Sequence, residues 1–148
     1  MFKWSLIGGL VWFEVTGKVA LGITYYLLAS NLFSYFYYHV WDTNREHQFR
    51  RDGRRFINWL SAVLFYIFSY AYIFTYHFHD QLDWGTLGAN AKFSEALIFS
   101  FANSLSANVS ELQPVTFAAR LLVLSETFTT FLFVVIIIAN SLPQTDAR

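Results

Sequence analysis

The sequence predicts an all-α integral membrane protein with three transmembrane helices and one short re-entrant helix and loop. Hydrophobic residues make up 55% of the 148 residues and only 14% are charged, below the roughly one quarter that is typical of soluble domains. Three long, predominantly apolar stretches have the length that a helix needs to cross a bilayer. A fourth apolar stretch, between the second and the third, is too short to cross and leads into a polar loop.

Composition also limits the chemistry that the chain can perform. The net charge is zero and there is no cysteine. A zero net charge gives no reason to expect a nucleic-acid partner. Without cysteine the chain has no disulfide framework, no thiolate nucleophile and no cysteine metal site.

The N-terminal part, residues 1–41, is predicted to contribute an extra transmembrane helix. Residues 1–18 are expected to form an interfacial or tilted helix that runs into the next segment. Glu14 and Lys18 would share one face of that helix, as an ordinary pair or as a functional pair within the membrane. Residues 19–41 contain no Asp, Glu, Lys or Arg and end in a run of aromatic residues, which is typical of a helix that meets the headgroups.

A basic loop follows at residues 42–55, with five arginines against three acids. Short basic loops between transmembrane helices lie on the cytoplasmic side by the positive-inside rule. A patch for lipid headgroups or nucleic acid is the alternative interpretation, and the interleaved acids favour the topological one. Residues 56–78 then form the second transmembrane helix, which runs from inside to outside.

Residues 79–90 carry almost no positive charge and are expected to form an external loop. His77, His79, Asp80 and Asp83 have side chains that can ligate a metal ion. We expect these side chains to be solvated instead, so the sequence predicts no metal and no cofactor.

The short apolar segment at residues 92–105 is expected to enter the membrane and to stop inside it. Ser94 and Glu95 lie at its start, where a capping side chain and a negative charge favour a helix N-terminus. The C-terminal dipole of this helix would point to the centre of the membrane and stabilise cations there. Residues 104–111 are mostly polar, and their backbone must be buried in protein or line water, because lipid cannot satisfy it.

The third transmembrane helix is predicted at residues 115–142, between Pro114 and Pro143, which both lie where helices tolerate proline. Three crossings and one re-entrant loop place the N-terminus outside and the C-terminus in the cytoplasm. We therefore expect an integral protein of the plasma membrane or an inner membrane, surrounded by membrane lipids.

Short motifs accompany this order of elements. Residues 96–101 read A-L-I-F-S-F, residues 114–116 read P-V-T, and residues 119–122 read A-R-L-L before Glu126. Together with the order of helices and loops, they resemble the potassium-channel pore domain, most closely that of bacterial two-helix ion channels. The resemblance covers about residues 56–142 and aligns without a gap.

This resemblance implies a channel-like pore domain at residues 56–148, preceded by the N-terminal segment and the basic loop. It implies an outer helix at residues 56–78, a pore helix at 92–105, a filter loop at 106–111 and an inner helix at 115–142. The residues that it assigns to the filter and the pore lining are Ser106, Ala107, Asn108, Val109, Ser110 and Glu111.

The filter loop departs from the family at its glycines. Both glycines of the family's T-V-G-Y-G-D filter are replaced, and no glycine follows Gly88. The family's filter needs glycine for the backbone conformations that aim successive carbonyl groups at the ion. Carbonyl cages selective for potassium are therefore not expected, and rings of Asn108 amides and Glu111 carboxylates would govern conduction instead.

We expect a homotetramer, because each chain offers one pore loop and a central pathway needs several around an axis. The predicted function is a weakly selective pore for monovalent cations. Arg120, Glu126 and Thr130 of the inner helix are candidates for gating or for support of the filter. Thr130 lies near the place where relatives often carry a hinge glycine.

Two other functions remain open. A non-conducting membrane scaffold, or a subunit of a larger complex, would keep the channel fold. It would use aromatic surfaces for partners or lipid, among them Tyr66, Phe68, Tyr70, Tyr72 and Phe74. An enzyme would need a site near the membrane interfaces, and we expect none because no catalytic motif accompanies His39, His77 and His79.

Overall fold

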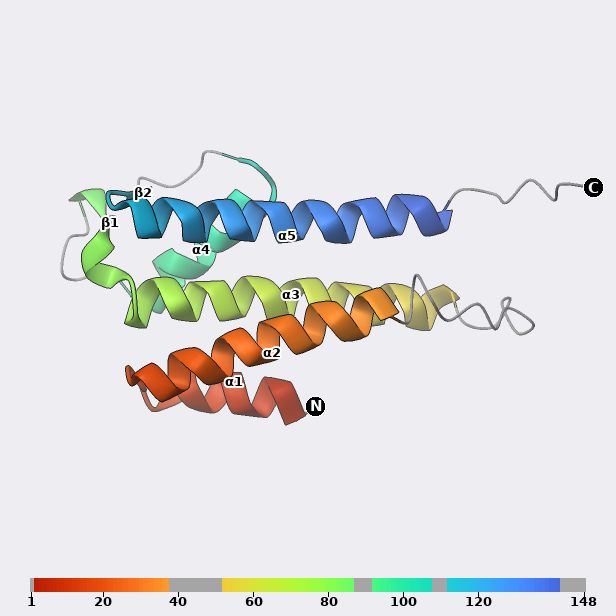
Figure 1. Cartoon of the computed structure of the whole chain (residues 1–148), viewed down its shortest axis with the longest axis horizontal. Helices are drawn as coiled ribbons and strands as arrows, with labels where there is room; N and C mark the ends of the chain where they lie inside the picture. The colour runs from red at the N-terminus through yellow and green to blue at the C-terminus, as the bar shows by residue number, and fades with distance from the viewer. Residues whose placement is uncertain (1, 38–51, 87–91, 108–111, 142–148) are drawn as a thin grey trace, which may run out of the picture.

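The computed structural model describes residues 2–37, 52–86, 92–107 and 112–141, and within them all side chains except those of residues 52–56 and 137–141. These residues form five α-helices and one small sheet (Figure 1). The helices are α1 (Phe2–Trp12), α2 (Lys18–Phe36), α3 (Asp52–Tyr76), α4 (Phe93–Ser104) and α5 (Phe117–Ser141). A 3₁₀ turn at His79–Gln81 leads into strand β1 (Leu82–Asp83), which pairs with strand β2 (Gln113–Pro114).

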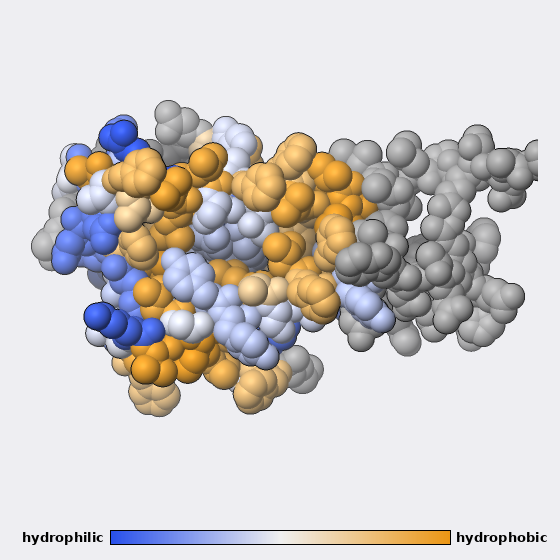
Figure 2. Space-filling view, in the orientation of Figure 1, coloured by the Kyte–Doolittle hydropathy of each residue, from blue (hydrophilic) through white to orange (hydrophobic). Residues whose placement is uncertain are grey.

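Three of these helices are long and apolar enough to cross a membrane, over Lys18–Phe36, Ile57–Tyr76 and Phe117–Ile136. The prediction of a mostly helical membrane protein with three such helices is therefore confirmed. Figure 2 shows hydrophobic side chains along the flanks of the molecule and hydrophilic ones gathered at the end where β1 and β2 lie. Apolar flanks suit contact with lipid, and a polar end suits contact with water.

Helix α3 lies at the centre of the molecule, between α1 and α2 on one side and α4 and α5 on the other (Figure 1). Its aromatic side chains fill the contacts on both sides. Tyr66, Tyr70, Tyr72 and Phe74 are at most 5% exposed, and Phe68 lies partly buried against the same core. The interpretation of these side chains as a surface for partners or lipid is therefore wrong, because they form the interior of a single chain.

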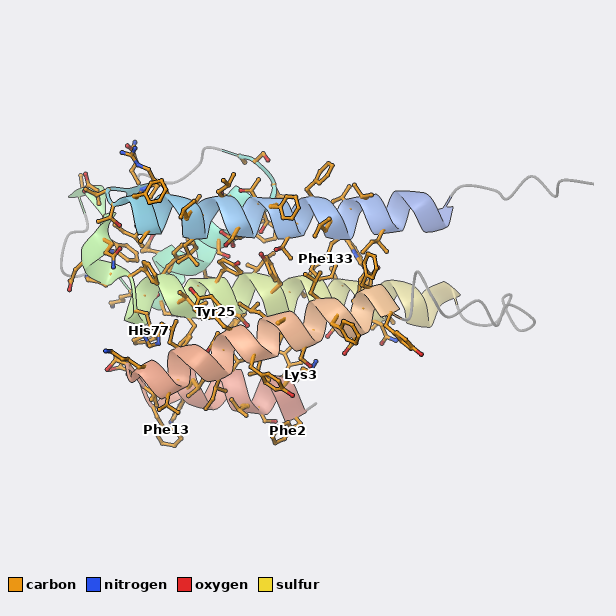
Figure 3. The ribbon with its side chains drawn as sticks, viewed as in Figure 1. Phe2, Lys3, Phe13, Tyr25, His77 and Phe133 are labelled. Carbon is orange, nitrogen blue, oxygen red and sulfur yellow. The ribbon has the colours of Figure 1, made fainter. Side chains whose placement is uncertain are left out.

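Helix α1 is a separate helix that folds back along α2, whereas the sequence predicted one helix running into the next. A turn at residues 13–17 separates the two, and Glu14 in that turn has a left-handed backbone with φ of 49°. Glu14 and Lys18 therefore do not share a helical face. Figure 3 shows Phe13 of this turn at the same end of the molecule as His77.

Contacts to both neighbours hold α1 in place. The Lys3 amine donates to Ser30 Oγ on α2 at 3.1 Å, and the Trp4 indole N–H donates to Ser61 Oγ on α3 at 3.2 Å. At the other end of α1, the Tyr72 hydroxyl donates to the carbonyl group of Val15 in the turn between α1 and α2. Helix α1 therefore runs antiparallel to α2 and parallel to α3.

A two-stranded clip joins the end of α3 to the start of α5. Strands β1 and β2 pair antiparallel, and the residue after β2 donates its N–H to the Gln81 carbonyl at 3.0 Å. Thr116 caps α5, because its Oγ1 accepts the N–H of Ala119 at 3.1 Å and donates to Gln81 Oε1 at 2.6 Å. Helix α5 consequently begins at Phe117, later than the predicted start at residue 115.

Thr116→Ala is expected to lower the free energy of unfolding by about 1–2 kcal/mol, since it removes the helix cap and the hydrogen bond to Gln81. The measurement is unfolding of the detergent-solubilised protein followed by circular dichroism. Thr116→Ser keeps the hydroxyl group and is the matched control, with stability close to that of the wild type. An equal loss in both variants would mean that the cap does not stabilise α5.

Candidate functional site

A buried polar cluster lies where α4 meets α5. Glu126 is 0% exposed although it belongs to an apolar helix that is long enough to cross a membrane. The side-chain amide of Asn103 on α4 donates to Glu126 Oε2 at 2.6 Å, and the Ser100 hydroxyl contacts Glu126 Oε1. With Thr127, these three residues form the Glu126 cluster.

The Glu126 cluster joins three helices. Ser100 Oγ lies 2.9 Å from the carbonyl oxygen of Ile67 on α3. Thr127 Oγ1 donates to Asn103 Oδ1 at 3.2 Å, and the Asn103 amide also reaches the Val123 carbonyl at 3.3 Å. The side-chain polar atoms of Asn103 and the carboxyl oxygens are thus all partnered, as buried polar groups require.

Two tyrosines of α3 fix the backbone of α5 at the same level. The Tyr66 hydroxyl lies 3.1 Å from the carbonyl oxygen of Ser125 and 3.3 Å from that of Glu126. The Tyr70 hydroxyl pairs with Ser125 Oγ at 2.8 Å. Thr130 donates its hydroxyl to the Glu126 carbonyl at 3.1 Å. Glu126 is therefore held both through its carboxyl group and through its backbone carbonyl.

The Glu126 cluster positions α4 rather than presenting a reactive group. Its contacts within the described residues are hydroxyl and amide groups, and the carboxyl group is closed to solvent. Asn103 lies against Val123 and Thr127, roughly 9–15 Å along α5 from Phe117 at 1.5 Å per residue. The last turn of α4 is thereby held about halfway along the apolar part of α5.

Helix α4 ends in a Schellman motif that contains no glycine. The N–H of Ala107 donates to the Ala102 carbonyl at 2.8 Å, and the N–H of Ser106 donates to the Asn103 carbonyl at 3.0 Å. Ser106 takes the left-handed position with φ of 54° and is exposed. A Cβ atom in this conformation costs roughly 1–2 kcal/mol, which is why glycine is usual there. The first residue of the predicted filter loop, Ser106, is therefore left-handed, whereas residues 108 and 110, which replace the two glycines, lie outside the described residues.

The start of α4 differs from the predicted cap. Lys92 is the N-cap residue, and it makes no side-chain capping hydrogen bond. Ser94 lies inside the first turn, so its prediction as a cap is wrong. Glu95 lies in the same turn, where the helix dipole favours its negative charge.

The predicted filter loop is described at its start. Ser106 and Ala107 follow Leu105, the C-cap residue of α4, and Leu112, the next described residue, is buried. The remaining predicted residues lie outside the described residues, namely Asn108, Val109, Ser110 and Glu111.

The three predicted residues of the inner helix lie in different environments. Arg120 is exposed, and its Nε donates to the Pro114 carbonyl at 3.4 Å. The carboxyl oxygens of Glu126 contact Ser100 and Asn103 of α4. Thr130 donates a hydrogen bond to the Glu126 carbonyl of its own helix. Among the hydrogen bonds of the described residues, none joins Thr130 to α4.

Sequence reasoning missed Ser100 and Asn103. The two residues are three apart on α4 and therefore face the same side of the helix. Both are polar within an apolar helix, and Glu126 is the one acid between residues 117 and 136. Polar positions on two apolar helices have to be buried against each other, and this was the signal available in the sequence.

Within the part of the chain that the structure describes, no group of three or more His, Cys, Asp or Glu side chains is placed to hold a metal ion. Two of the residues considered for such a site make other contacts. The His79 ring stacks on Trp84 with 4.8 Å between ring centroids, and Asp83 Oδ1 accepts the N–H of Gly85 at 3.0 Å.

Comparisons with known proteins were negative. No protein family, curated protein or solved structure matches the chain. The function proposed below therefore rests on the geometry of the chain itself.

Asn103→Ala is expected to lower the free energy of unfolding by about 1–3 kcal/mol, because it removes the amide that donates to the buried Glu126 Oε2. Unfolding in detergent, followed by circular dichroism, measures this loss. Thr130→Val is the control, since it removes a hydroxyl group that bonds to a main-chain carbonyl already served by the helix. The cluster is not structurally important if both variants lose the same amount.

Ser106→Gly is expected to stabilise the protein by about 0.5–1 kcal/mol, because glycine adopts the left-handed conformation without a Cβ penalty. Ser106→Val should destabilise it, since a β-branched side chain is poorly tolerated there. Ala107→Gly is the control at the neighbouring position, where φ is not positive, and it should not stabilise. Equal effects of glycine at both positions would contradict the Schellman geometry.

Proposed function

We propose that the chain forms a homotetrameric, weakly selective pore for monovalent cations, with residues 106–111 as its filter loop. The observation that carries this proposal is the path of the chain between β1 and β2. Strand β1 precedes α4, strand β2 follows the filter loop, and the two strands pair. The segment between them therefore leaves one end of the molecule, reaches the level of Glu126 and returns to the same end (Figure 1).

A path of this kind fits the lining of a pore. The last turn of α4 lies beside the middle of an apolar helix that is long enough to cross a membrane. Backbone that is not helical is tolerated at such a depth only where it is buried in protein or lines water. We therefore assign α4 the role of the pore helix and place the filter loop next to a water-filled axis.

Four copies around an axis would bring four filter loops together, because each chain contributes one. Glu111 would form a ring of carboxylates that attracts cations, and Asn108 would form a ring of amides below it. Side chains, rather than cages of carbonyl groups, would then meet the ion, which favours weak selectivity. Glu126 would act from behind the loop, by holding the pore helix at a fixed depth.

The proposed orientation follows the positive-inside rule. The predicted basic loop at residues 42–55 lies between α2 and α3 in the sequence, with residues 52–55 forming the first turn of α3, and we place it in the cytoplasm. The sheet and the turn between α1 and α2 then lie outside, and the C-terminus lies in the cytoplasm of a plasma or inner membrane. The sequence predicted an N-terminus outside the membrane. Because α1 folds back along α2, we propose instead that its first residues lie within the thickness of the membrane.

Glu111→Gln is expected to lower the cation flux several-fold, because it removes the carboxylate ring that concentrates cations at the outer mouth. The flux of monovalent cations into liposomes that contain the purified protein measures this effect. Glu14→Gln is the control, since it removes the same charge from the α1–α2 turn at the same end of the molecule, and it should leave the flux unchanged.

Absence of cation flux at every voltage and pH tested would refute the pore. A reduction of equal size in Glu14→Gln and Glu111→Gln would leave the pore but remove Glu111 from its mouth.

A non-conducting membrane scaffold is the second candidate, and the end of α4 favours it. The carbonyl groups of Ala102 and Asn103 already accept N–H groups of the following loop. A helix end whose carbonyl groups are occupied in this way offers less of the negative dipole end that would stabilise cations within the membrane. Copurification of a different membrane protein with a monomeric, non-conducting chain would support the scaffold.

A further inference from the structure

We infer that Lys3 binds the phosphate group of an anionic phospholipid, with the Ser30 hydroxyl as a second hydrogen-bond donor. The site lies on the face of the molecule formed by α1 and α2, which has no part in the filter loop. The inference goes beyond the proposed pore and takes from it only the orientation of the chain, which makes this a lipid of the cytoplasmic leaflet.

Lys3 lies beside the apolar parts of two helices that are able to cross a membrane. Its amine donates to Ser30 Oγ at 3.1 Å, roughly 9 Å before the end of α2 at 1.5 Å per residue. The indole N–H of Trp4 donates to Ser61 Oγ, roughly 6 Å inside the apolar part of α3 by the same measure. Figure 3 shows Lys3 at the opposite end of α1 from Phe13. The contacts therefore hold the lysine at a depth that lipid surrounds, near the cytoplasmic ends of α2 and α3.

The positive charge of Lys3 is not neutralised by the described part of the chain. The amine bonds to an uncharged hydroxyl group, and none of the acids whose side chains are described pairs with it. The first turn of α1 contains no acid, and the helix dipole disfavours a cation at this end of a helix. A charge among apolar groups is costly without a partner of opposite sign, so Lys3 at this depth requires an anion.

The two side chains have hydrogen-bond donors to offer to a phosphate group. The ammonium group has three N–H donors and directs one of them to Ser30. The Ser30 hydroxyl accepts that bond, and its own O–H remains able to donate. Lys3 and Ser30 are both half-buried, so the donors can be approached from the lipid side. Bonds from an ammonium group to phosphate oxygens are charge-assisted and therefore among the stronger hydrogen bonds.

A phospholipid is the anion that fits this position. It carries its charge at the level of the headgroups, and the long lysine side chain can extend toward that level from within the hydrocarbon region. Phe2 and Phe33, within one helical turn of the two donors, are 77% and 65% exposed and suit contact with acyl chains. Basic positions between helices on the cytoplasmic side are known to bind anionic headgroups. A soluble anion would bring no apolar part to cover the neighbouring rings.

Native mass spectrometry of the detergent-solubilised full chain tests the site, with phosphatidylglycerol or phosphatidylcholine as the added lipid. Lys3→Gln is expected to lower the apparent affinity for phosphatidylglycerol roughly fivefold, which is the effect of one basic side chain at an anionic surface. Lys3→Arg keeps the charge and should keep the affinity. Lys18→Gln is the matched control, since it removes the same charge from the other end of α2 and should leave the affinity unchanged. The arginines of the basic loop are present in every variant and do not affect the comparison.

Three results would overturn the site. They are an unchanged affinity in Lys3→Gln, an equal loss in Lys3→Gln and Lys18→Gln, and equal binding of both lipids by the wild type. Circular dichroism checks that all variants have the same helical content, and recovery of binding in Lys3→Arg separates the loss of charge from a loss of fold.

The unfolding temperature with inorganic phosphate in place of lipid distinguishes a lipid from a soluble anion. We expect phosphate to leave it unchanged. A rise in the wild type that is absent in Lys3→Gln would make the ligand a soluble anion and overturn the lipid. Binding of phosphatidylglycerol at Lys3 in a chain that conducts no cations would keep this inference and refute the pore, whereas conduction without that binding would refute this inference alone.

Discussion

A buried carboxyl group within an apolar helix sets the central constraint on this structure. Glu126 is fully buried, and hydroxyl and amide groups from α4 surround its carboxyl oxygens. A polar group of this kind is costly without partners, so α4 has to lie where Ser100 and Asn103 reach it. The same contacts extend to α3 through the carbonyl of Ile67. The position of the short helix therefore follows from one side chain of its long neighbour.

Two short helices of the fold end in the same way. Helix α1 ends with N–H groups of Val15 and Glu14 bonded back to Leu10 and Val11, and α4 ends with the corresponding bonds at residues 106 and 107. Both Schellman motifs place a residue other than glycine, Glu14 or Ser106, in the left-handed position. Each chain reversal thus carries some backbone strain, which the packing of the helix against α3 has to offset.

Much of the fold could be predicted from the sequence because its signals are local. The three helices that are able to cross a membrane follow from unbroken apolar stretches, and the short helix follows from an apolar stretch bounded by polar residues. Helix boundaries depend on more distant contacts. Helix α5 begins two residues later than predicted, because Thr116 caps it and contacts Gln81 beside the β1–β2 clip. The reversal after α1 was missed, because the residues around Glu14 carry no glycine at the position that turns left-handed.

In the candidate site, too, some features have local sequence signals and others depend on contacts between distant residues. By itself the sequence determined the membrane class, the order of long and short helices, and the presence of one acid in the last apolar span, since each depends on composition and spacing along the chain. Only the tertiary structure decided that Ser100 and Asn103 are the partners of that acid, and that the aromatic residues of α3 face inward. Partnership between helices depends on their relative depth and rotation, which are set by the summed packing of side chains that are distant in sequence. Local patterns show which polar residues of an apolar helix need partners, but not which pairs of them meet.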